Sequence, residues 1–118
     1  MIMFLKSIYS QKFATILLLL YIYMNLFKIK NSEILKYVNS SSNIVERKQT
    51  LPILANLLFI LENGILTIKG FDQEIQIVCQ LKIKSDQQTR FTVPARKLND
   101  ILRNLPEDID VSFSLIDG

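Results

Sequence analysis

The stretch from residue 90 to residue 105 reads RFTVPARKLNDILRNL. It begins with a short predicted strand, Arg90 to Val93, and then meets Pro94, a residue well suited to the first position of a helix. Apolar residues follow at the helical spacing i, i+3, i+4, i+7, which predicts a helix to about Leu105 with these side chains on its core face: Leu98, Ile101, Leu102 and Leu105. The polar residues of this helix are then expected to face away from the core: Arg96, Lys97, Asn99, Asp100 and Arg103.

Three strands are predicted upstream of this stretch. Residues 53–61 are nearly all apolar, Asn63-Gly64 favours a tight hairpin turn, and residues 65–69 return as the second strand. Residues 74–83 alternate between polar and apolar side chains with a period of two, which predicts a strand with one buried face. Cys79 shares the apolar face and is expected to be a small buried hydrophobe.

The first part of the pattern is a strand followed by a helix. Residues 25–30 alternate like a strand, and residues 31–42 carry apolar residues on one helical face, with Asn31 or Ser32 able to cap the helix. The serine run at 40–42 is expected to end the helix, and residues 43–49 to form an exposed loop. A last one-faced strand is predicted at 109–115. The expected fold class is therefore α+β, with two helices packed on an antiparallel sheet.

The composition excludes most catalytic sites. The 118 residues include no His and one Cys, so a Ser/His or Cys/His pair, a zinc site and a disulfide framework are not available. The glycines at 64, 70 and 118 fit no phosphate-cradling loop. We therefore expect a protein that is not an enzyme and has no cofactor and no metal.

The first 23 residues differ from the rest. Residues 13–24 form an apolar run behind Lys6 and Lys12, which is typical of a secretory signal. No small-residue cleavage site follows, and the run is shorter than the roughly 18 apolar residues of a membrane-spanning helix. Two interpretations remain open: a signal or anchor, or residues upstream of a natural start at Met24.

The net charge of +3 comes mostly from this segment. From Met24 onward the chain has 12 basic and 11 acidic residues, a net charge of +1. Such a balance says little about partners, so the distribution of the charges over the fold is what matters.

Two motifs resemble those of a known family. They are TLPILANLL at 50–58 and TVPARK at 92–97, the latter followed by LRNLP at 102–106. With the basic loop before the first motif and the Asn-Gly hairpin between the two, they closely resemble the first domain of the bacterial DNA polymerase III beta subunit, the sliding clamp. The resemblance extends from Met24 to Gly118 and implies the DNA clamp fold.

The family is a non-catalytic processivity factor in the cytoplasm, so the resemblance implies a role in DNA replication. Two three-domain subunits close head to tail around double-stranded DNA, without sequence specificity, and tether the replicative DNA polymerase. The resemblance implies that residues 24–118 are the first clamp domain, incomplete at its C-terminal end, and that residues 1–23 are an extension outside the fold. The polymerase and the clamp loader bind the family through later domains.

The resemblance also implies which residues contact DNA. Lys48 matches a basic loop residue that contacts DNA in the family, and Arg96 lies at the start of a helix that lines the ring. Secondary candidates are Arg47, Lys36 and Arg103. The alternative for each of these five is an ordinary solvated surface charge, which is the commoner role of an exposed Lys or Arg. The chain has Ile44-Val45-Glu46 where the family often has a glycine-rich approach to the loop, so we expect the loop around Lys48 to differ in geometry from that of the family.

An acidic residue lies among the candidate cations. Asp100 lies within one helical turn of both Arg96 and Arg103 and could partly neutralise them. The alternative to a clamp domain is a membrane-tethered α+β interaction module that uses residues 13–24 as its anchor.

Overall fold

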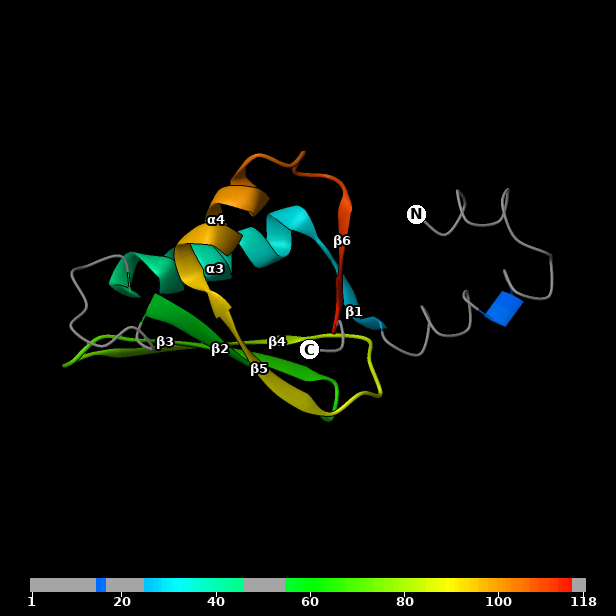
Figure 1. Ribbon diagram of the computed structural model, residues 1–118, viewed down its shortest axis with the longest axis horizontal. Coiled ribbons are helices and arrows are strands. Elements are labelled where there is room, and N and C mark those ends of the chain that lie inside the picture. The colour runs from blue at the N-terminus through cyan, green and yellow to red at the C-terminus, as the bar shows by residue number, and fades with distance from the viewer. Residues whose placement is uncertain (1–14, 17–24, 46–54, 116–118) are drawn as a thin grey trace. The chain divides into compact units, whose positions relative to one another are not determined.

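The computed structural model describes residues 15–16, 25–45 and 55–115. These residues fall into two compact units, one of residues 28–111 and a smaller one that contains residues 15–16, 25–27 and 112–115. The elements follow the order strand, helix, four strands, helix, strand (Figure 1): β1 Asn25–Lys30, α3 Asn31–Val45, β2 Asn56–Glu62, β3 Ile65–Phe71, β4 Gln76–Lys82, β5 Thr89–Pro94, α4 Ala95–Arg103 and β6 Asp110–Ser114.

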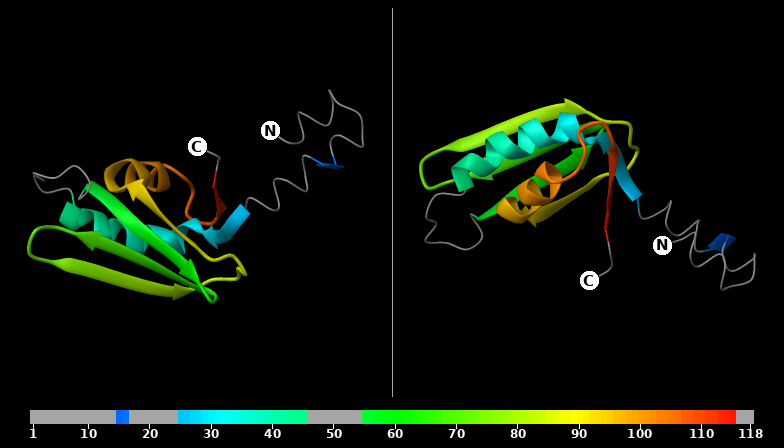
Figure 2. Two further views of the ribbon diagram at one scale, coloured as in Figure 1. Left: turned by 60° about the horizontal axis from the view of Figure 1, so that its bottom comes forward. Right: turned by 90° about the horizontal axis from the view of Figure 1, so that it is seen from above.

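The larger unit is a four-stranded antiparallel sheet covered on one face by two helices. The strands lie in the order β4-β3-β2-β5. Helices α3 and α4 lie side by side over the same face of this sheet (Figure 2). The predicted α+β class, with helices packed on antiparallel sheet, is confirmed.

The alternation of each strand explains which side chains form the core. Phe59 of β2 pairs with Ile68 of β3, which pairs in turn with Cys79 of β4, so apolar residues lie in register on one face of the sheet. Phe59 also pairs with Phe91 of β5, and their ring centroids lie 5.3 Å apart. Side chains from both helices complete this core, and all of the following are buried: Ile34, Val38, Leu98 and Leu102. Burial of this apolar surface is the main force that holds the helices to the sheet.

The predicted Asn-Gly turn is present, whereas the predicted burial of Cys79 is incomplete. Asn63 and Gly64 both have positive φ, 53° and 73°, as the predicted tight Asn-Gly turn requires. Cys79 is half-buried, because β4 is an edge strand of this sheet. The prediction that Cys79 is buried was therefore only partly correct. Its Sγ lies 3.8 Å from the Ser41 hydroxyl oxygen.

Helix α3 continues through the serine run and ends at Val45. The prediction that the run ends the helix was therefore wrong, as was the loop assigned to residues 43–45; the rest of that loop, residues 46–49, lies outside the described residues. Ser41 and Ser42 are fully buried, and the Ser42 hydroxyl donates to the Ala95 carbonyl oxygen at 3.3 Å. A serine that has a tertiary partner no longer competes for the backbone of its own helix.

Helix α4 begins later and ends earlier than predicted, and its buried face is rotated. Pro94 is the N-cap, with extended backbone, and the last helical residue is Arg103. Ile101, which we assigned to the core face, is 50% exposed, whereas Asn99, which we assigned to the solvent face, is 2% exposed. The buried stripe is Ala95, Leu98, Asn99 and Leu102. This set also follows the i, i+3, i+4, i+7 spacing, so periodicity alone could not separate the two choices.

In the smaller unit, strand ends carry an aromatic pair. The Phe27 and Phe113 rings are stacked with centroids 4.6 Å apart, and the Ser114 hydroxyl donates to the Asn25 side-chain oxygen at 3.3 Å. Strands β1 and β6 form a two-stranded sheet, which confirms the strand predicted near the end of the chain.

Candidate nucleic-acid interface

Helices α3 and α4 are antiparallel and are joined by polar contacts along their length. At one end the Asn31 amide donates to the Leu102 carbonyl oxygen. In the middle the Asn99 amide donates to the Asn39 side-chain oxygen at 3.3 Å. At the other end Ser42 bonds to Ala95. Because polar partners at three levels specify the register, the two helices present their outer side chains in a fixed relationship.

Asn31 holds the end of α4 with one side chain. Its Nδ2 donates to the carbonyl oxygens of Leu102, Leu105 and Pro106 at 3.0, 3.1 and 3.0 Å. Its backbone N–H donates to the Ile109 carbonyl at 2.8 Å, and the Ser32 N–H donates to the Glu107 carbonyl at 3.0 Å. The start of α3 and the turn after α4 are therefore one hydrogen-bonded unit. Asn31 or Ser32 was expected to cap this helix, but the Asn31 side chain donates to carbonyls at the end of α4 instead.

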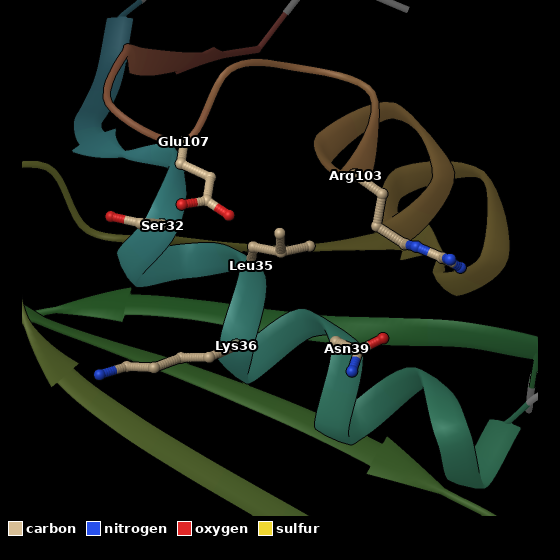
Figure 3. A pocket seen from close by; sticks show the side chains of 6 residues that line it. All are labelled: Ser32, Leu35, Lys36, Asn39, Arg103 and Glu107. Atoms are coloured by element: carbon tan, nitrogen blue, oxygen red, sulfur yellow. The ribbon is translucent and has the colours of Figure 1, made fainter.

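An open groove of about 590 Å³ lies beside this junction. Figure 3 shows its lining, which comes from α3, from the end of α4 and from the turn that follows: Ser32, Leu35, Lys36, Asn39, Arg103 and Glu107. In this view the Lys36 ammonium and the Arg103 guanidinium point in opposite directions, with Leu35 between them. The Lys36 Nζ lies 5.1 Å from the centroid of the Tyr37 ring, within reach of a cation–π contact.

Arg96 and Lys97 extend the basic surface to the first turn of α4, where both are exposed. Arg96 and Arg103 are seven residues apart, so they lie on nearly the same side of the helix, separated by about 10.5 Å along its axis. The structure thus places three of the five candidates on the exposed sides of one helix pair: Lys36, Arg96 and Arg103. Arg47 and Lys48 lie outside the described residues.

Sequence reasoning missed the structural roles of three members of this region. Asn31 and Asn99 are buried polar residues in the interface between the helices, and Glu107 contributes a carboxylate to the groove. Hydrophobic periodicity assigns every polar residue to the solvent face, so it gave no signal for the two asparagines. The proximity of Glu107 to Arg103 depends on the turn after α4, which the pattern did not resolve.

The described residues contain no cluster of His, Cys, Asp or Glu that could hold a metal ion. Within ranges 15–16, 25–45 and 55–115, none of the helices has both the length and the apolar character needed to cross a bilayer.

Comparison with known proteins identifies the family. Residues 24–117 match the family described as "DNA polymerase III beta subunit, N-terminal domain". The chain belongs to this family. Its relatives include the beta sliding clamp of Pseudomonas aeruginosa, 38% identical over 70% of this chain and 23% of that protein, and the beta sliding clamp of Vibrio harveyi, 36% identical over 75% of this chain and 62% of that sequence.

Solved structures of beta sliding clamps share the fold. The clamp of Pseudomonas aeruginosa superposes with a TM-score of 0.73 at 34% identity, over 79% of this chain and 26% of that one. The Caulobacter crescentus clamp gives 0.73 at 31% identity, over 80% of this chain and 25% of that one. The chain thus spans about a quarter of the length of these clamp structures. These matches confirm the resemblance to the sliding clamp and give no support to the membrane-tethered alternative.

Proposed function

We propose that the chain supplies the first domain of a sliding clamp, a non-catalytic ring that encircles duplex DNA and tethers the replicative DNA polymerase. In this proposal a second clamp subunit closes the ring head to tail, and the polymerase and clamp loader bind domains outside residues 24–118. The ring works in the cytoplasm, where bacterial DNA is replicated. Membership of the DNA polymerase III beta subunit family supports this role.

The observation that carries the proposal is a group of exposed cations on the outer side of helices α3 and α4: Lys36, Arg96, Lys97 and Arg103. Arg96 and Lys97 lie in the first turn of α4, where the helix dipole disfavours cations, and that turn contains no acidic residue. Helix stability therefore gives no reason for cations at these positions. Attraction to phosphate does, and it requires no contact with bases.

A ring that slides needs attraction to the DNA backbone without base readout, since base contacts would hold it at one sequence. The exposed cations on this surface are flexible Lys and Arg side chains, which suit phosphates. Glu33, Asp100 and Glu107 lie among them and lower the net positive charge of the surface. Weak, non-specific attraction is what this mixture of charges favours.

Two further DNA contacts belong to the proposal through the family resemblance. Lys48 is proposed as a loop contact to DNA, and Arg47 as its neighbour. Both precede the TLPILANLL motif, whose residues 56–58 are the first three of β2.

A domain exchange tests the proposed function. Residues 24–117 replace the matching segment of the Pseudomonas aeruginosa clamp, and the chimera is loaded onto nicked circular DNA. We expect the chimera to stay on the circle and to be released when the DNA is linearised. A chimera that sediments as a folded dimer but is not retained on circular DNA would contradict the proposal. The matched control carries Arg96→Ala and Arg103→Ala, and we expect its retention to disappear at a lower salt concentration.

A further inference from the structure

We propose that Asn31 is a positioning residue for Arg103. It holds the last turn of α4 and thereby fixes the place of the Arg103 guanidinium at the edge of the groove. The inference rests on the proposed function, because it assigns Arg103 a DNA phosphate as its partner.

Asn31 donates hydrogen bonds to backbone carbonyls at the C-terminal end of α4. The last carbonyls of a helix have no partner within the helix and need one from elsewhere. Asn31 Nδ2 supplies one to Leu102, the residue before Arg103, and also to Leu105 and Pro106. These three carbonyls lie on both sides of Arg103 in the sequence, so a single amide fixes the backbone that carries it.

The buried side-chain amide of Asn31 acts as a hydrogen-bond donor and not as an acceptor. The side chain is fully buried, and its Oδ1 accepts no hydrogen bond from the described residues. A substitution that removes the donor takes one hydrogen bond from each of these three carbonyl groups, of which Leu102 retains the Leu105 N–H at 3.3 Å, while removal of the oxygen takes no hydrogen bond away.

Asn31 is connected to the groove through its neighbour in the chain. Ser32 follows Asn31 and bonds through its N–H to Glu107, and both residues line the groove together with Arg103 (Figure 3). The position of Arg103 relative to α3 and Glu107 is thus set by bonds that converge on the first two residues of α3. Lys36, one turn further along α3, belongs to the same groove.

The other end of α4 provides a contrast. Ser42 bonds to the Ala95 carbonyl at that end, next to Arg96. Ser42→Ala therefore removes an interhelical hydrogen bond of the same helix pair but leaves the turn at Arg103 intact. It is the matched control for general destabilisation.

The first readout needs no DNA. The 118-residue chain is labelled with ¹⁵N, and side-chain order is measured by relaxation of the arginine Nε–Hε groups, below the unfolding transition of every variant. For Asn31→Leu, which replaces the amide with an apolar side chain of similar size, we expect lower order at Arg103 and unchanged order at Arg96. For Ser42→Ala we expect unchanged order at Arg103. Equal order at Arg103 in the parent chain and in Asn31→Leu would overturn the inference.

The second readout is a double-mutant cycle for duplex DNA binding at low salt. If Asn31 acts through Arg103, Asn31→Leu weakens binding in the parent chain but has no further effect in the Arg103→Ala background. Ser42→Ala is expected to have the same effect in both backgrounds. Independent, additive losses for Asn31→Leu and Arg103→Ala would also overturn the inference.

The two readouts separate this inference from the proposed function. Loss of order at Arg103 in Asn31→Leu, together with unchanged DNA binding in Arg103→Ala, would establish the positioning and refute the DNA contact. Loss of binding in Arg103→Ala, without any change of order in Asn31→Leu, would support the DNA contact and refute the positioning.

Discussion

Gly70 of β3 lies against the backbone of Ser41 in α3. A Cβ atom at Gly70 would be 2.9 Å from the Ser41 carbonyl oxygen and 3.3 Å from a methyl carbon of Leu57. A backbone carbonyl in a packed helix has little room to move away, so the absence of a side chain at this position is what allows α3 to approach the sheet.

Gly70→Ala should therefore destabilise the fold. Pushing α3 away from β3 or distorting either element is expected to lower the free energy of unfolding by about 1–3 kcal/mol. Urea denaturation followed by circular dichroism measures this difference. The nearby substitution Thr67→Ala on the same strand, which removes volume instead of adding it, separates overpacking from a general sensitivity of β3. A Gly70→Ala variant as stable as the parent would show that the helix can shift at no cost.

The hairpin turn gives a second prediction, which depends on backbone conformation instead of space. Gly64 has a φ of 73°, and a Cβ there would meet its nearest neighbour at an ordinary 3.5 Å. Gly64→Ala is expected to cost about 1 kcal/mol of stability, because alanine is strained at positive φ. Gly64→Asn should cost less, since asparagine tolerates this region. Equal costs for the two variants, measured by the same denaturation, would argue against strain as the cause.

The rotated face of α4 gives a third prediction. Leu102 is fully buried and Ile101 is 50% exposed. Leu102→Ala should lower the free energy of unfolding by about 2–5 kcal/mol, because it leaves a cavity in the core. Ile101→Ala should change it by about 0.5 kcal/mol or less. Thermal unfolding of the two variants tests the face directly. A larger loss of stability in Ile101→Ala than in Leu102→Ala would instead support the buried face predicted from the sequence.

The buried asparagine at the helix junction gives a fourth prediction, on stability alone. Asn31→Ala leaves the carbonyls of Leu102, Leu105 and Pro106 without this donor, and we expect the free energy of unfolding to fall by about 1–3 kcal/mol. It is compared with Asn39→Ala, which takes one hydrogen bond, of 3.3 Å, from the buried Asn99 amide in the middle of the interface. Similar decreases for the two variants, measured by urea denaturation, would mean that the junction is no more important than the middle of the interface.

The sequence predicted the elements well because their signals are local. The alternation in β4 and the Asn-Gly turn each specify structure within a few residues, and the structure contains both. The end of α3 was misplaced because Ser41 and Ser42 have partners far away in the sequence, on β4 and at the start of α4. The face of α4 was misassigned for a related reason. Two sets of residues in α4 fit the helical spacing of a buried face. The choice between them depends on contacts with α3, such as the hydrogen bond from Asn99 to Asn39, which the sequence does not reveal.

The candidate site was predictable to the level of individual cations but not of their surroundings. Lys36, Arg96 and Arg103 were expected on polar helix faces, and they are exposed there. That Asn31 supports the end of α4 and that Glu107 joins the groove follow from the turn after α4. No local pattern encodes the position of that turn.

Binding of DNA phosphates by the basic side of α3 and α4 is tested most directly by the salt dependence of duplex binding. It is compared for two triple variants of equal net charge: Arg96, Lys97 and Arg103 changed to Gln on α4, and Lys69, Lys82 and Arg90 changed to Gln on the four-stranded sheet. We predict that the helix variant weakens binding equally for unrelated DNA sequences and reduces the slope of log K against log salt by about 0.9 for each phosphate that is no longer neutralised, while the sheet variant retains the parent slope. Equal effects of the two variants would contradict this prediction, because net charge rather than this helix surface would then account for the binding.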